Sequence, residues 1–171
     1  MIILGIDPGI AIVGYGVIEY TKGKFRLIAM GSIETPAGLD VEERLQMVYD
    51  DMCELIDTYR PDEMAIEELF FNTNQKTAIA VAEARGVILL SAVQRKVPIS
   101  EYTPLQVKQS VVGYGRAEKK QVITLVGMIL GMENGPKLDD TADALALAIC
   151  HAHTGGSKMQ EYFNQKKKRL L

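Results

Sequence analysis

Acidic side chains stand at three places where the sequence pattern predicts a strand end or a buried helix. Asp7 follows the first short apolar run, and Glu67 and Glu68 lie within a later one. Asp139, Asp140 and Asp143 open an alanine- and leucine-rich segment. Helical spacing puts Asp140 and Asp143 on one face, where their like charges repel. Because burying several carboxylates is costly unless a cation compensates them, this set predicts a site for a hard divalent cation.

The type of ligand narrows the choice of ion and of chemistry. The sequence has no cluster of His and Cys, which favours Mg²⁺ or Mn²⁺ over zinc. Two such ions about 4 Å apart can activate a water and stabilise the leaving oxygen of a phosphodiester. Taken singly, each acid keeps a structural alternative: Asp7 as a turn former, Asp140 as a helix cap, and one of Glu67 and Glu68 as an outward-facing strand residue.

Composition and length indicate one globular domain rather than a disordered or membrane protein. The chain has 171 residues, of which 47% are hydrophobic and 24% charged. No apolar run is long enough for a membrane helix, and the first residues lack the layout of a signal peptide. Two cysteines, Cys53 and Cys150, are too few for a disulfide framework. We therefore expect a cytoplasmic protein without a membrane partner.

The net charge of −3 conceals an uneven distribution along the chain. Residues 34–68 contain twelve acidic side chains and two arginines. Residues 104–120 contain four basic side chains and one acidic one, and residues 155–171 contain five basic and one acidic. Such asymmetry is compatible with one face that meets a polyanion while another repels it.

Hydrophobic periodicity predicts the elements that position these residues. Strands are expected over residues 2–6, 14–20, 25–33, 64–69 and 99–103, and helices over 45–59, 77–96, 104–112, 118–132 and 140–153. The early hairpins favour antiparallel pairing, and the later alternation of strand and helix favours parallel additions. We expect an α/β domain over residues 1–154, with a mixed five-stranded sheet and helices on both faces. The basic segment 155–171 is expected to be a mobile tail.

Short motifs along most of the chain resemble the bacterial Holliday junction endonuclease family RuvC. They run from residue 1 to about residue 153 in the family's order and approximate spacing. The motifs are Gly5-Ile6-Asp7-Pro8-Gly9, Gly14-Tyr15-Gly16-Val17, Ala65-Ile66-Glu67, Ala84-Arg85-Gly86, Gln106-Val107-Lys108-Gln109, Val111-Val112-Gly113, Ala117-Glu118-Lys119 and Asp140-Thr141-Ala142-Asp143-Ala144-Leu145-Ala146. The resemblance implies a ribonuclease H-like fold.

The resemblance also implies an activity and its site. The four family acids fall on Asp7, Glu67, Asp140 and Asp143. They imply an endodeoxyribonuclease that resolves four-way junctions by paired symmetric nicks. Two Mg²⁺ ions per subunit are implied as cofactors, with Mn²⁺ as a substitute. The implied partners are four-way junction DNA, a second copy in a homodimer, and the branch-migration proteins RuvA and RuvB.

The family's DNA-contacting positions can be matched as well. Its two lysines fall on Lys108 and Lys119, and its junction-facing aromatic falls on Phe70. An aromatic ring beside an unpaired base can stack on it. The alanine-rich segment 77–96 is our candidate for the dimer interface.

Three other functions remain as alternatives. An actin-like ATPase or sugar kinase also begins with strands and an Asp-containing phosphate turn, but typically needs two such domains. A nuclease of ribosomal RNA precursors shares the early Asp-x-Gly pattern. A catalytically silent junction-binding protein is disfavoured by the intact set of acids.

Overall fold

The sheet at the centre of the molecule has the mixed, five-stranded form expected from the sequence. The computed structural model describes residues 1–68, 75–133, 135–136 and 139–155, with the backbone alone for residues 75–77. In chain order the elements are β1 (Ile2–Asp7), β2 (Ile12–Thr21), β3 (Lys24–Glu34), α1 (Val41–Tyr59), β4 (Glu63–Glu67), α2 (Gln75–Gln94), β5 (Ile99–Tyr102), α3 (Pro104–Val112), α4 (Lys119–Ile129) and α5 (Asp139–Thr154). The spatial order is β3-β2-β1-β4-β5, with antiparallel pairing among the first three strands and parallel pairing of β1, β4 and β5.

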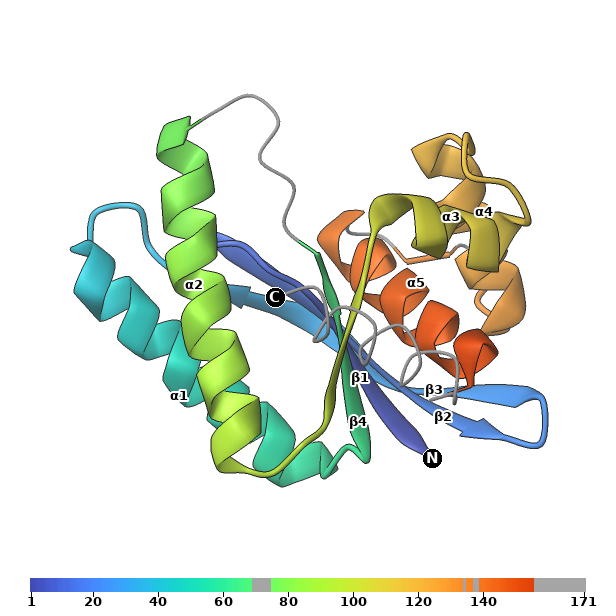
Figure 1. The fold of residues 1–171 in the computed structure, drawn as a ribbon, viewed down its shortest axis with the longest axis horizontal. Coiled ribbons are helices and arrows are strands. Elements are labelled where there is room, and N and C mark those ends of the chain that lie inside the picture. Colours follow the sequence, from blue (N-terminus) through green and yellow to red (C-terminus); the bar gives the residue numbers. More distant parts are fainter. Residues whose placement is uncertain (69–74, 134, 137–138, 156–171) are drawn as a thin grey trace, which may run out of the picture.

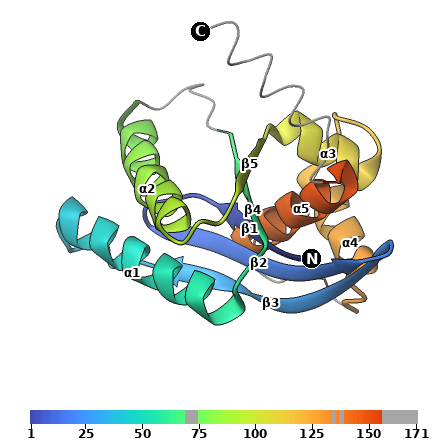
Figure 2. The ribbon, with the colours of Figure 1, turned by 60° about the horizontal axis from the view of Figure 1, so that its bottom comes forward.

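Helices cover both faces of this sheet (Figures 1 and 2). Strand side chains alternate between faces, so neighbouring residues of β1 enter different cores. Ile3 packs in the core beneath α3, α4 and α5, whereas Leu4 and Ile6 pack in the core beneath α1 and α2. The acidic helix α1 and the lysine-bearing helices α3 and α4 therefore lie on different sides of the sheet.

Glycines in β1 and β2 let helix α5 lie directly against the sheet. A Cβ atom on Gly5 would overlap the carbonyl oxygen of Ala144, and one on Gly14 would overlap the carbonyl oxygen of Asp140. Most of α5 is buried as a result, from Thr141 to Ala152 except Asp143. This close approach fixes the first turn of α5 beside the end of β1.

Local capping sets the starts of the two helices that carry the predicted DNA-contacting lysines. The Thr103 hydroxyl accepts a hydrogen bond from the Gln106 amide at 3.1 Å, and the Gln106 side chain accepts one from the Thr103 amide at 2.8 Å. The Gln121 side chain likewise accepts a bond from the Glu118 amide at 2.9 Å. These reciprocal caps satisfy backbone donors at each helix start.

Most predicted element ends differ from the structure by one to four residues, and two of these differences have a clear local cause. The strand expected over 64–69 ends at Glu67, where its pairing with β5 ends at Tyr102. The helix expected over 118–132 ends at Ile129, because Gly131 adopts a left-handed conformation (φ 67°) that terminates it.

No helix among the described residues is long and apolar enough to span a membrane.

Candidate active site

Two of the predicted acids end adjacent parallel strands. Ile6 of β1 pairs with Ile66 of β4, so Asp7 and Glu67 follow side by side at the carboxyl ends of these strands. Both residues are partly buried. The parallel pairing thus brings together two carboxylates that lie sixty residues apart in the sequence.

The first turn of α5 adds the other two acids to this group. The pKa of Asp7 is raised from 3.8 to about 7, mainly by burial and further by the charges of Glu67, Asp143 and Asp140. Burial also raises the pKa of Glu67, with a further contribution from Asp143. The four predicted acids therefore act electrostatically on one another at one end of the sheet.

Lys119, at the start of α4, partly compensates this negative charge. Its Nζ lies 3.0 Å from Oδ2 of Asp143 and 3.4 Å from Oδ2 of Asp139. Burial tends to lower the pKa of Lys119, but its hydrogen bonds and charge interactions with Asp143 and Asp139 outweigh burial and raise it. Lys119 also lowers the pKa values of Asp7 and Glu67. Its ammonium group is thus a counter-ion of the acidic group.

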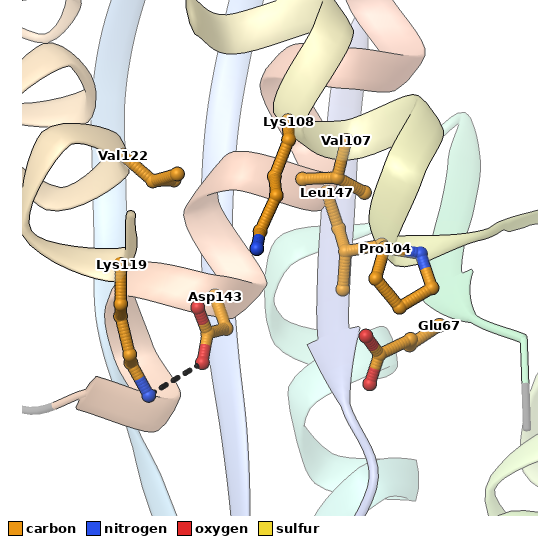
Figure 3. Close-up of a pocket in the computed structure, with 8 residues that line it drawn as sticks. All are labelled: Glu67, Pro104, Val107, Lys108, Lys119, Val122, Asp143 and Leu147. Carbon is orange, nitrogen blue, oxygen red and sulfur yellow. Dashed lines mark ion pairs between the residues drawn. The ribbon is translucent and has the colours of Figure 1, made fainter. Parts of the chain in front are cut away.

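A cavity of about 220 Å³ opens beside these carboxylates (Figure 3). Its polar lining consists of Glu67, Asp143, Lys108 and Lys119, and its apolar lining of Pro104, Val107, Val122 and Leu147. Lys108 extends from α3 and Lys119 from α4 toward the Asp143 side chain. The cavity places both predicted lysines next to two of the predicted acids, Glu67 and Asp143. The charges of these two acids and of Asp140 act on Asp7.

The donor set fits a hard divalent cation by its chemistry. All four side chains offer carboxylate oxygens, and burial with mutual repulsion favours a positive ion among them. Within the described part of the chain, however, no three His, Cys, Asp or Glu side chains are arranged to hold one ion together. Because Asp143 is turned to Lys119, the carboxylates must reorient to share an ion.

Several contacts at the site were not predicted from the sequence. Asp139 is not among the four predicted acids, yet it lies within ion-pair distance of Lys119. Arg85 reaches from α2 to the end of β4, where its Nε donates a hydrogen bond to the carbonyl oxygen of Glu67 at 3.3 Å. The motif Ala84-Arg85-Gly86 was the only sequence signal for this contact. The predicted residue Phe70 lies outside the described residues.

Comparisons with known proteins give a consistent result. Residues 3–151 match the family model of crossover junction endodeoxyribonuclease RuvC. The chain is 57% identical to the crossover junction endodeoxyribonucleases RuvC of Alkaliphilus metalliredigens, over 91% of this chain and 94% of that protein, and of Clostridioides difficile, over 90% and 91%. The structure of T. thermophilus RuvC in complex with Holliday junction substrate is 36% identical and superposes with a TM-score of 0.86, over 90% of this chain and 93% of that one.

The structural similarity confirms the ribonuclease H-like fold expected from the sequence motifs. The match covers the sheet, the helices on both faces and the elements that carry the four acids. With this match, and with identity above half to proteins of nearly the same length, the chain belongs to the crossover junction endodeoxyribonuclease RuvC family.

Proposed function

We propose that this protein is an endodeoxyribonuclease that resolves four-way DNA junctions by paired, symmetric nicks. The observation that carries the proposal is the group of four coupled carboxylates, next to a cavity lined by two lysines. A chain of the RuvC family with this group fits hydrolysis of a phosphodiester. Residues 1–154 form the nuclease domain in this proposal, and residues 155–171 form the tail.

Asp7, Glu67, Asp140 and Asp143 are the proposed metal ligands. The RuvC nucleases as a family are metal-dependent, and oxygen ligands favour Mg²⁺, with Mn²⁺ as a substitute. Two bound ions would supply an activated water and stabilisation of the leaving oxygen. Asp7 lies centrally in the group, because each of the other three acids raises its pKa. Asp7 is therefore the proposed shared ligand.

The two lysines are proposed to hold the phosphate of the strand to be cut. Lys119 already neutralises Asp143 at 3.0 Å. If Asp143 held a metal ion, the Lys119 ammonium would be available to a phosphate oxygen in the same cavity. Lys108 lines that cavity from α3 and provides a second positive charge. A cation beside the reacting phosphate stabilises the negative charge that develops there. Phe70 is proposed to stack on a base at the junction centre.

A homodimer would present one such site to each of two equivalent strands, because a four-way junction has approximate two-fold symmetry. Helix α2 supports this assembly with exposed apolar side chains along one face, at spacings compatible with helix–helix packing. Ile79 and Val93 are each 62% exposed and Leu90 is 47% exposed. Gly86 lies on the same face, and a Cβ atom there would meet nothing within 4 Å, so a second helix can approach closely. Sedimentation of the Leu90→Asp variant as a monomer would support this interface.

Family membership supports RuvA and RuvB, the branch-migration proteins, as partners that act on the same junction. Work on chromosomal junctions would place the protein in the bacterial cytoplasm.

Incubation with synthetic substrates tests the proposed function. The protein is mixed with a four-way junction, a linear duplex of the same sequence and a structured RNA, each with Mg²⁺. Symmetric nicks in the junction alone are expected. Cleavage of the RNA alone would favour a nuclease of RNA precursors. Turnover of ATP without nicking would favour a kinase-like activity, and junction binding without nicking would favour a silent binding protein.

A further inference from the structure

We propose that Arg85 is a positioning residue that fixes the end of strand β4 and thereby the direction of the Glu67 carboxylate. The proposal rests on the proposed function, because it assigns Glu67 to the metal site. Arg85 belongs to α2, on the face of the sheet remote from Lys108 and Lys119. Its guanidinium group reaches the edge where β4 and β5 end.

Two contacts of the guanidinium group bridge these strand ends. Nε donates a hydrogen bond to the carbonyl oxygen of Glu67 at 3.3 Å, and Nη2 lies 3.0 Å from Oε2 of Glu101. Glu101 is the β5 residue next to Tyr102, which pairs with Glu67. Arg85 thus joins α2 to the last paired residues of both strands. Its planar fork can contact two acceptors at once in fixed geometry.

The energetics of Arg85 point to a role other than stability. Its side chain is only 13% exposed, and among the described residues Nη2 has the ion pair but no hydrogen bond of good geometry. A buried donor that lacks a hydrogen bond costs free energy, and an ion pair with an exposed partner, here Glu101, contributes little to stability. A well-packed apolar residue would stabilise the helix–sheet contact at least as well. The positive charge of Arg85 is explained by its contacts with Glu67 and Glu101 at the ends of β4 and β5.

Arg95, which directly follows the end of α2, provides a contrast. Its Nε and Nη2 each donate a 2.8 Å hydrogen bond to the Asp57 carboxylate on α1. This pair links the end of α2 to α1 and touches no residue of the proposed site. Arg95 is therefore the control for loss of an arginine contact that anchors α2 to its surroundings.

The orientation of the Glu67 carboxylate needs such support because a like charge lies on the same cavity. Glu67 and Asp143 both line it, so without a metal ion their carboxylates repel each other when both face inward. Rotation of the Glu67 peptide would relieve this repulsion by turning the side chain away. A misplacement of about 1 Å at a reacting centre can cost roughly 100-fold in rate.

The test compares Arg85→Gln, Arg85→Lys and Arg95→Gln in the full chain. Binding of Mn²⁺ without DNA is measured by calorimetry, junction binding is measured in Ca²⁺, and single-turnover nicking is measured against Mg²⁺ concentration. Arg85→Gln is expected to bind Mn²⁺ more weakly and to nick roughly 10- to 100-fold more slowly, with junction affinity unchanged. Arg85→Lys should recover part of the Mn²⁺ affinity and part of the nicking rate, because its ammonium can still donate a hydrogen bond to the Glu67 carbonyl oxygen. Arg95→Gln should match the wild type in metal binding and nicking.

Wild-type Mn²⁺ affinity and nicking rate in Arg85→Gln would overturn the proposal. Equal losses in Arg85→Gln and Arg95→Gln would also overturn it, since they would reflect a general effect on α2. If Arg85→Gln does not fold, Glu101→Gln replaces it, and weaker Mn²⁺ binding is expected there too. Failure of the wild type to nick a junction would instead refute the proposed function, while Mn²⁺ calorimetry would still test Arg85.

Discussion

The protonation of Asp7 links the stability of the protein to its metal site. Its pKa rises from 3.8 to about 7 because the carboxyl group is buried and because three acids surround it. The folded protein therefore holds a proton on Asp7 that the unfolded chain releases at lower pH. Stability from this proton is complete below about pH 3.8 and is lost as the pH rises through about 7.

This linkage predicts a metal-dependent pH profile for the melting temperature. In EDTA, the Tm of the wild type should fall relative to that of Asp7→Asn between about pH 5 and about pH 8. Saturating Mg²⁺ should bind the ionised carboxylates and so remove the difference between the two proteins in the slope of Tm against pH. Thermal denaturation of both proteins across this range measures the effect. Parallel Tm profiles in EDTA would show that Asp7 titrates normally.

Asp143 offers a second prediction at the residue scale. Asp143→Asn should abolish nicking, because a neutral amide is a poor ligand for Mg²⁺, while junction binding persists. Stability in EDTA should be unchanged or slightly higher, since Asp7 and Glu67 lose a repelling charge and the partly exposed pair with Lys119 contributes only about 0–1 kcal/mol.

The control for Asp143→Asn is Asp57→Asn, which also removes an acid from an ion pair, here with Arg95. That variant should nick at the wild-type rate. Nicking by Asp143→Asn at the wild-type rate in Mg²⁺ would remove Asp143 from the site.

At the scale of elements, the packing of α5 against β1 and β2 determines where Asp140 and Asp143 lie. Gly14 faces the carbonyl oxygen of Asp140 so closely that a methyl group would displace the start of the helix. Gly14→Ala should therefore destabilise the fold by roughly 1–3 kcal/mol through overpacking. It should also slow nicking strongly, because Asp140 and Asp143 move away from Asp7.

Denaturant unfolding and single-turnover nicking measure the two effects of Gly14→Ala. Gly38→Ala is the matched control, because a Cβ atom there meets nothing within 4 Å and no left-handed backbone angle is involved. It should leave both quantities unchanged. A stable, fully active Gly14→Ala protein would mean that the sheet does not set the helix position.

The elements themselves were predictable because each is determined by short-range patterns. Alternating and helical spacings predicted the mixed sheet and the helices on both faces, and the four acids were recognised from their family motifs. Contacts between distant residues left no such pattern. His151, which is not among the predicted site residues, is fully buried. Its Nε2 lies 2.6 Å from Oε2 of Glu63, and its Nδ1 lies 2.7 Å from the Tyr102 hydroxyl. Burial lowers the pKa of His151 more than Glu63 raises it. The lowered pKa favours the neutral ring.

For the whole molecule, the fold resolves the conflict between an acidic chain and a DNA substrate. The acidic helix α1 covers one face of the sheet, and Lys108 and Lys119 lie on the other (Figure 2). A phosphate in the cavity would therefore meet positive side chains although the net charge is −3. The sheet thus separates the acidic region of the molecule from the basic one. In the sequence these regions are visible only as separate segments of the chain.

This separation predicts the salt dependence of junction binding. Each lysine that neutralises a phosphate contributes about 0.9 to the slope of log affinity against log salt. Lys108→Gln and Lys119→Gln should each weaken binding and flatten the slope by about that amount. Lys22→Gln, in the turn between β2 and β3, is the control and should change neither. Titrations at several salt concentrations provide the slopes, and three wild-type slopes would place the phosphate contacts elsewhere.

Cleavage of a supercoiled plasmid that extrudes a cruciform tests most directly whether two coupled sites resolve a junction. A single nick relaxes the plasmid, and the cruciform is then reabsorbed before a second independent nick. With Mg²⁺, the wild type should convert the supercoiled plasmid straight to the linear form, with both nicks at symmetric positions across the junction. Accumulation of open circles alone, or equal cleavage of a plasmid without the cruciform, would contradict a dimeric junction resolvase.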